Sequence, residues 1–518
     1  MRRETKGLTK LWALGVLFVA HHSLSLMVFA AAALAESPPA AAARAALADL
    51  RTQPVARRNG LRYLTINSDQ EETAIAYVLN AVSRSRLVVR PELAGPGLLR
   101  IDLVHYANPR ESGSFAELRA AWEKLVTIDP YFHLRSQVVV PLAADREQTK
   151  EQSLRQHATK RAAASVSTGS ASVTTVTIDG GWIPPDVAAE LKVLAVSAGP
   201  VLRGDFFVAH AATAPLYYDF AGIPGTEAEL LKRLGIDRGV IDKLSADTAA
   251  NLLVSRVTSK PRRIVRLPGA LGGVWYTRDV AVETPDRDPV RTPINYAGSA
   301  GRQSLRFDAS EWFAQKENGF WLTAVYDAAG KRQDTVVDAI AKDTTAHDGI
   351  VRPLVSCVRC HELNGGQSGM QPIEDDQFAL LSGEAAVLKS YLPDVARRVQ
   401  ELYDPERLQR AQARDRQDYA AAVEQATGAG PHAAADALAR MYANFVDRPV
   451  TREVAAAESG LGVEQFVMAM RQSTDPVILA LRAGREIKRA SYEASFQDVM
   501  LRIGSLRGQD AKAQASTP

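Results

Sequence analysis

The residues best suited to chemistry in this chain form one short run, Cys357-Val358-Arg359-Cys360-His361. The run follows the C-x-x-C-H pattern by which c-type haem is attached covalently. Two thiols three positions apart lie one above the other on a helical turn, so both can reach the two vinyl groups at one edge of a porphyrin. The histidine that follows then supplies the proximal iron ligand. The pattern therefore predicts one covalent haem c, with Cys357 and Cys360 forming the thioethers and His361 as the metal ligand.

Two other chemistries use the same residue types. A C-x-x-C pair is also typical of thiol-redox proteins, but there it stands at the start of a helix that follows a strand, and His361 would have no role. A structural zinc site needs about four ligands, whereas the chain has two cysteines in total, both in this run, and its other histidines are scattered. Haem is the favoured interpretation, and a haem-free thiol-redox protein is an alternative.

The second axial position of the iron would decide between two kinds of haem protein. Methionine in that position favours electron transfer, whereas an open position favours binding or reducing a small molecule such as a gas or peroxide. Met370, in the Gly- and Gln-rich loop 362–371, is the nearest candidate ligand. The competing interpretation is that its thioether only fills an apolar gap. The remaining candidates are expected at the surface or in a helical core: His347, His432, Met441, Met468 and Met470.

The elements that must position the motif can be predicted around it. Pro353 can open a short helix, and the glycines at 365–366 can end it. Upstream, residues 263–333 show a β pattern, in which Glu317-Asn318-Gly319 joins two aromatic segments as a hairpin. Five large aromatic side chains of this region are expected in a hydrophobic core: Trp275, Trp312, Phe313, Phe320 and Trp321. Downstream, residues 376–506 show apolar residues at helical spacing.

The N-terminal half predicts a further mixture of strands and helices. Strands are expected at 61–66, 87–89 and 98–106, and a turn followed by a strand at 203–208. A helix capped by Asp69 should run to Val82. Capping boxes that begin at Ser114 and Thr226 should open two more helices.

Composition and targeting signals narrow the setting. The chain has 518 residues and a formal net charge of +3, so no overall charge points to nucleic acid. Residues 1–35 resemble a secretory signal, with a basic start, apolar runs and Ala33-Leu34-Ala35 as the cleavage site. An uncleaved membrane anchor is the alternative. Export suits the motif, because haem is attached covalently outside the bacterial cytoplasmic membrane.

The order of the motifs resembles a family of large exported bacterial proteins that lack an assigned function and end in a cytochrome c-like domain. The similarity spans most of residues 59–505, and its motifs other than C-x-x-C-H are informative through their order. The segments that carry it are Arg62–Thr65, Leu99–Leu103, Val201–Ala209, Pro215–Tyr217, the hairpin, Ser356–His361, Gly460–Val463 and Phe496. The resemblance implies an exported haem protein with a long N-terminal partner region. The loop with Met370 departs from the short aliphatic, lysine-containing segment expected there.

The fold class expected is a multidomain α+β protein, with N-terminal mixed α/β regions containing β-hairpins and a C-terminal all-α cytochrome c-like haem domain. The expected division is signal 1–35, linker 36–58, small α/β domain 59–142, linker or disordered insertion 143–180, mixed α+β domain 181–340, haem domain 341–506 and tail 507–518. The expected function is electron transfer with an extracytoplasmic redox partner protein. We expect a periplasmic location, no nucleic-acid partner, and membrane contact only through an uncleaved N-terminus.

Overall fold

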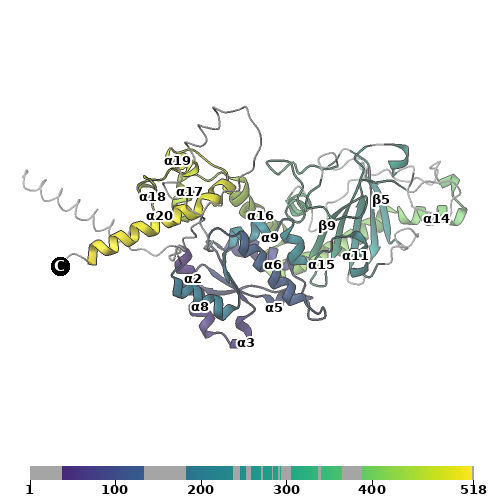
Figure 1. Ribbon diagram of the computed structural model, residues 1–518. Coiled ribbons are helices and arrows are strands. Elements are labelled where there is room, and N and C mark those ends of the chain that lie inside the picture. Colours follow the sequence, from purple (N-terminus) through teal and green to yellow (C-terminus); the bar gives the residue numbers. More distant parts are fainter. Residues whose placement is uncertain are drawn as a thin grey trace, which may run out of the picture.

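The structure is a computed structural model that mixes helices with two β-sheets, in agreement with the α+β class (Figure 1). It describes residues 38–132, 183–236, 246–252, 258, 260–269, 272–282, 284–289, 292, 305–336, 340–363 and 388–515. The expected signal at 1–35, the insertion at 143–180 and Met370 lie outside these residues. The five-stranded sheet lies at one end of the molecule in Figure 1, and the C-terminal helices α17 to α20 lie at the other.

A four-stranded sheet organises the N-terminal unit. Its strand order is β2-β3-β1-β4, with β1 antiparallel to β3 and parallel to β4. The strands are β1 Leu61–Thr65, β2 Glu92–Gly95, β3 Leu98–Asp102 and β4 Val201–Arg203. The helices of the unit are α2 Pro38–Thr52, α3 Val55–Arg58, α4 Asp69–Val82, α5 Leu103–Tyr106, α6 Ser114–Ile128, α8 Pro185–Ala195, α9 Gly204–Ala211, α10 Leu216–Ala221 and α11 Glu227–Arg233.

The predicted linker at 36–58 is wrong for its described part, because residues 38–52 form helix α2. One face of α2 is buried through alanine and leucine side chains at helical spacing, among them Ala43, Leu47 and Leu50. Alanine has the highest intrinsic helix propensity. An alanine-rich stretch can therefore be a packed helix as well as a linker, and composition alone does not separate the two.

Three other predictions in this unit are corrected. The strand expected at 98–106 ends at Asp102, because the Asp102 carboxylate accepts a hydrogen bond from the Val104 amide at 3.1 Å and opens α5. The residues expected as a strand at 203–208 begin α9 instead. The residues expected as a strand at 87–89 are followed by β2 and lie outside any strand. Each case has an apolar run that is too short to distinguish strand from buried helix.

Helix starts were predicted with mixed success. Thr226 caps α11 and accepts a hydrogen bond from the Glu229 amide, which confirms that cap. Helix α4 is capped by Ser68 and not by Asp69, although its range was predicted correctly. Helix α6 begins at Ser114, but its cap is Gly113 in a left-handed conformation, and the Ser114 hydroxyl accepts a hydrogen bond from the Asn108 amide instead.

A five-stranded antiparallel sheet forms the second layer, with strand order β5-β6-β7-β8-β9. Its strands are β5 Thr248–Leu252, β6 Arg262–Pro268, β7 Gly273–Arg278, β8 Ala309–Gln315 and β9 Trp321–Asp327. The predicted hairpin joins β8 to β9, and Gly319 takes φ = 81°, which suits glycine. The five aromatic side chains expected in the core are all buried, which confirms that prediction.

The C-terminal helices pack against the five-stranded sheet and against helices of the N-terminal unit. Helices α14 Pro393–Leu402 and α15 Pro405–Thr427 contact β5, and α16 Pro431–Tyr442 packs on α4. The others are η4 Leu388–Ser390, η5 Ala443–Asp447, α17 Arg452–Glu458, α18 Val463–Ala469, α19 Pro476–Arg482 and α20 Arg489–Ala515, with the short turn η1 Pro285–Arg287 upstream. In the described parts of the chain, no helix is both long and apolar enough to cross a membrane.

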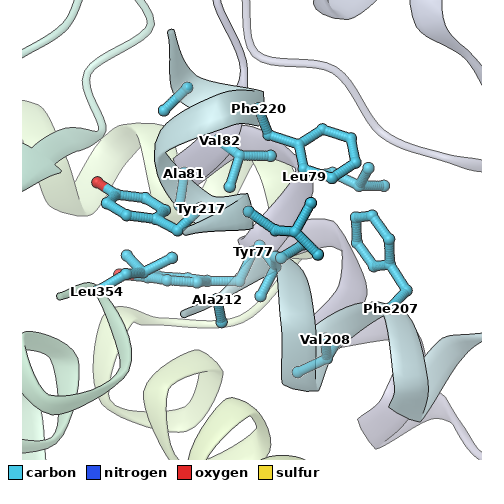
Figure 2. Packing of buried hydrophobic residues seen from close by; sticks show 14 of the residues in the cluster. Tyr77, Leu79, Ala81, Val82, Phe207, Val208, Ala212, Tyr217, Phe220 and Leu354 are labelled. Carbon is cyan, nitrogen blue, oxygen red and sulfur yellow. The ribbon is translucent and has the colours of Figure 1, made fainter. Parts of the chain in front are cut away.

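One hydrophobic core connects the motif region to the N-terminal unit. The main core cluster contains buried residues from Ala43 through to Ile503. Figure 2 shows Leu354, which stands three residues before Cys357, among the side chains of Tyr77, Ala212 and Tyr217. The segment that leads into the motif therefore packs against side chains from α4, α10 and the residue after α9, all far from it in sequence.

Candidate functional site

The C-x-x-C-H run begins on a one-turn helix and continues into a wider turn. Helix α13 covers Val355–Val358, and the π-helical turn η2 covers Arg359–Leu363. Leu354 precedes α13 with φ = 68°, which is unusual for a residue other than glycine. Its amide donates to the Thr323 hydroxyl at 3.1 Å, and its side chain is buried. A short helix was predicted here, but it begins at Val355 and not at Pro353, and its predicted end at 365–366 lies outside the described residues. The strained entry at Leu354 holds it against strand β9.

One face of the five-stranded sheet supports the motif. The Cys357 thiol lies 3.8 Å from the Glu311 carboxylate and donates a hydrogen bond to it. The His361 ring centroid lies 4.7 Å from that of Phe313. Glu311 and Phe313 are two positions apart on β8, so their side chains leave the sheet on the same face. Thr323 pairs with Phe313 on β9 and shares that face. The motif thus lies on a β surface.

Both thiols of the motif are buried, and the surroundings of Cys357 keep that thiol protonated. Cys357 and Cys360 are 6% and 9% exposed and form no disulfide. Burial raises the pKa of Cys357 well above its ordinary value, and the nearby Glu311 raises it further. Burial likewise raises the pKa of Glu311. Because the thiolate is the nucleophile in thiol–disulfide exchange, Cys357 in this environment is a poor exchange nucleophile at neutral pH.

The imidazole of His361 is in the form that ligates metals. Burial lowers its pKa to about 4, and the positive charge of Arg262 contributes to the shift. The ring is therefore neutral at physiological pH, as a metal-bound histidine must be. Its Nδ1 atom is buried and has no hydrogen-bond partner among the described residues. A buried polar atom without a partner is costly, and a bound group is one reason for such an arrangement.

These side chains fit haem c. The two thiols stand three positions apart, at the end of α13 and in the turn that follows it, which is the spacing used for attachment of haem c. The neutral imidazole follows directly, and the aromatic ring of Phe313 restricts its orientation. The fit rests on the donor set and its environment.

The other side of the motif is held by α16 and the residues that follow it. Arg359 forms an ion pair with Asp447 at 3.3 Å, and its guanidinium lies 5.0 Å from the Tyr442 ring centroid. The Nδ1 atom of His432 lies 3.0 Å from the carbonyl oxygen of Glu362. Since a carbonyl only accepts, this nitrogen carries the proton. These contacts fix the turn that carries Cys360 and His361.

The structure places the remaining sequence candidates away from a ligand role, except Met370, which lies outside the described residues. His347 is exposed and pairs with Asp447 at 3.0 Å. Met441 and Met470 are buried in the helical core, as expected. The core prediction is wrong for Met468, which is 62% exposed. Met468 and Met470 are two positions apart on or beside one helix, and such positions face in different directions.

Sequence reasoning missed the sheet residues beneath the motif, Glu311 and Thr323. Strict alternation along β8 would have placed Glu311 on the face of Phe313. No pattern in the neighbouring sequence would have placed that face against Cys357.

In the described ranges, no group of three or more His, Cys, Asp or Glu side chains has the geometry to hold a metal ion.

Comparisons with models of protein families, with curated proteins and with solved structures return no match to this chain.

Proposed function

We propose that this chain is an exported single-haem c-type cytochrome-like protein that transfers electrons. In this proposal Cys357 and Cys360 hold haem c covalently, and His361 ligates its iron. The observation that carries the proposal is the set of three side chains on one short helical run: two buried thiols and a neutral imidazole with an unpartnered buried nitrogen. The cytochrome c-like identity of residues 341–506 is part of this proposal.

Bound haem would supply one-electron chemistry that the side chains alone lack. The protein's own contribution is positioning and polarity. Phe313 and the turn held by Arg359 restrict the imidazole, so His361 is presented in one orientation. Burial keeps the imidazole neutral, so no proton has to leave before it binds a metal. Glu311 holds the Cys357 thiol in one position through its hydrogen bond.

The location and the partner are also proposals. The basic start and apolar runs of residues 1–35 support export to the periplasm, or an N-terminal membrane anchor if the segment is not cleaved. The electron acceptor or donor would then be an extracytoplasmic redox protein. Met370 remains the proposed second axial ligand, on sequence grounds alone.

The thiol-redox alternative is less well supported. Catalytic cysteines of that kind have a lowered pKa and partial exposure, whereas Cys357 is buried and its pKa is raised. The open-site haem alternative shares every contact described above and differs only at the second axial position.

The first experiment is expression of the full chain, with residues 1–35, in a bacterial host that matures c-type haem. The pyridine haemochrome spectrum should show haem c, and the intact mass should exceed that of the polypeptide by one haem. The double variant Cys357→Ala/Cys360→Ala should lack the added mass. A wild-type protein with two free thiols and no added mass would reject both haem hypotheses.

A second measurement distinguishes an electron-transfer haem from a haem with an open axial position. Rapid carbon monoxide binding by the reduced protein at neutral pH would argue for an open position and against the electron carrier. Met370→Ala should abolish a methionine–iron charge-transfer band. An unchanged spectrum would show that Met370 is not the axial ligand.

A further inference from the structure

A cavity of about 200 Å³ opens where the starts of α4, α9 and α20 meet α16 and the residues that follow it. Its wall contains Glu71 near the start of α4, Asp205 at the start of α9, and Arg489 at the start of α20. Ser68 and Gln70 adjoin Glu71, and the remainder comes from α16, η5 and α17. No residue of the C-x-x-C-H run lines it, so an inference about this cavity is independent of haem.

The cavity has a rigid acidic side. Glu458 accepts hydrogen bonds from Arg489 at 2.8 and 2.7 Å and from Arg203 at 3.0 Å. Asp205 binds Arg203 through two more, at 3.0 and 2.6 Å. Each ionised carboxylate has about four lone-pair positions, so both retain acceptor capacity for a ligand. Their geometry is fixed by the arginines before any ligand arrives, which lowers the entropy lost on binding.

The basic side of the cavity has fewer hydrogen bonds to neighbouring side chains. Arg440 donates through Nε to Asp436 at 2.7 Å, and its side chain is 66% exposed. Its two terminal amino groups are suited to a carboxylate, which the guanidinium group can bind through two parallel hydrogen bonds. The amide side chains of Gln70 and Asn444 line the same cavity.

The wall also has an apolar part, formed by Ala437, Met441, Phe445 and Val454. Met441 and Phe445 are buried, with exposed fractions of 5% and 4%. A ligand that fills the cavity must therefore carry apolar groups as well as polar ones. Pockets for drug-sized ligands occupy roughly 300–1,000 Å³, so this cavity suits a smaller molecule.

The distribution of charge suggests the ligand class. The carboxylates of Asp205 and Glu458 lie on one side of the wall, and the exposed guanidinium group of Arg440 lies on another. A ligand with one group of each sign can match both sides, whereas an ion of a single sign can match only one. We propose that the cavity binds a free α-amino acid with an aliphatic side chain, whose ammonium group faces Asp205 and Glu458 and whose carboxylate faces Arg440.

The test uses L-leucine as the probe on the full chain, with isothermal calorimetry and thermal unfolding as readouts. Leucine should bind and raise the Tm. Leucinamide lacks the carboxylate and 4-methylpentanoate lacks the ammonium group, so each should bind at least tenfold more weakly. No binding of leucine at millimolar concentration, or equal binding of the three probes, would overturn the proposal.

Two variants locate the site. Ala437→Leu places extra atoms in the cavity and should weaken leucine binding at least tenfold, whereas Ala433→Leu on the exposed face of the same helix should not. Arg440→Gln tests the carboxylate contact on an exposed side chain, so folding is not at risk. Its matched control is Arg410→Gln, because Arg410 also pairs with an acid one helical turn away. Binding that survives both Ala437→Leu and Arg440→Gln would place the ligand elsewhere and reject this site.

Discussion

The Sγ atom of Cys357 lies 3.8 Å from the Oε1 atom of Glu311, and both side chains are largely removed from water. A buried carboxylate beside a buried thiol disfavours the thiolate, since two negative charges would then face each other. The contact joins the first cysteine of the motif to strand β8, forty-six positions earlier in the chain. It links the reactivity of the thiol to the sheet.

The first prediction concerns that pair. In haem-free protein made without residues 1–35, Glu311→Gln should lower the pKa of Cys357, because it removes the negative charge that helps to raise it. The pKa should stay above its ordinary value, since burial is the larger cause. The pH dependence of alkylation measures it, in a Cys360→Ser background where Cys357 alone reacts. The exposed Glu406→Gln is the control, and an unchanged Cys357 pKa in Glu311→Gln would refute the coupling.

The second prediction concerns His210, on α9. Burial lowers its pKa to about 4 from an ordinary value of 6.5. Between these values the unfolded chain binds the proton and the folded protein does not, so stability falls as the pH drops below 6.5. This histidine should remove about 2 kcal/mol of stability between pH 7 and pH 5. Its ring centroid lies 4.4 Å from that of Phe206, and His210→Phe preserves an aromatic side chain there.

The measurement is urea unfolding of wild type and His210→Phe at several pH values. The difference in unfolding free energy should shift in favour of the variant as the pH falls from 7 to 5. Between pH 7 and pH 8 it should remain constant, because the histidine is then neutral in both states. A difference that is the same at pH 5 and pH 7 would contradict the assignment.

Local patterns predicted those parts of the fold that local physics decides. The hairpin at Gly319 was predicted because a positive φ angle suits glycine and aromatic segments flank it. The start of α11 was predicted because the Thr226 side chain satisfies an amide at the first helical turn. The prediction of a strand at 98–106 is wrong beyond Asp102, because the side chain of Asp102 caps a helix that begins at the next residue.

The candidate site was predictable only in part, for the same reason. The donors Cys357, Cys360 and His361 are adjacent in sequence, so their spacing was visible. Apart from burial, the pKa of Cys357 is raised by Glu311 on β8 and that of His361 is lowered by Arg262 on β6, and both effects depend on how the sheet meets the motif. The buried hydroxyl pair of Tyr77 and Tyr419, 2.6 Å apart, joins residues 342 positions apart, which no sequence period could indicate.

The third prediction concerns Lys316, which ties the β8–β9 hairpin to helix α4. Its ammonium group donates to the carbonyl oxygens of Asn80 at 2.8 Å, Ala81 at 2.7 Å and Ser83 at 3.0 Å. These carbonyls lie at or just beyond the C-terminal end of α4, where a helix leaves carbonyl groups without intrahelical partners. The Asn80 carbonyl also accepts from the Ser83 amide and from Asn318 Nδ2 at 3.0 Å. Lys316→Met should reduce the free energy of unfolding by about 2–4 kcal/mol, because it takes this donor from the carbonyl groups of Ala81 and Ser83.

Urea denaturation checks this value. Lys331→Met is the matched control, since Lys331 is an exposed lysine just after the same hairpin. It should change stability by less than about 0.5 kcal/mol. Equal effects from the two lysines would mean that the three hydrogen bonds contribute little.

The last prediction concerns Asp415, which holds helix α15 to the five-stranded sheet. Its carboxylate is 1% exposed and accepts hydrogen bonds at 2.8 Å from Arg266 Nε, Arg266 Nη2 and Trp275 Nε1. Asp415→Asn removes the charge that faces the guanidinium and leaves one amide group pointing at donors. Breaking a buried pair by removing one partner costs about 3–5 kcal/mol. The second acid beside Arg266, Asp247, should bring the loss towards the lower end of that range.

The control is Asp418→Asn, an exposed acid one turn further along α15. It should leave stability within about 0.5 kcal/mol of wild type. The double variant Asp415→Asn/Arg266→Met should lose less stability than the sum of the two single variants. It removes the guanidinium charge that Asp415→Asn alone would leave without its buried partner. Additive losses would mean that the two side chains act independently, and the ion pair would then not be what fixes α15 against the strands beneath the motif.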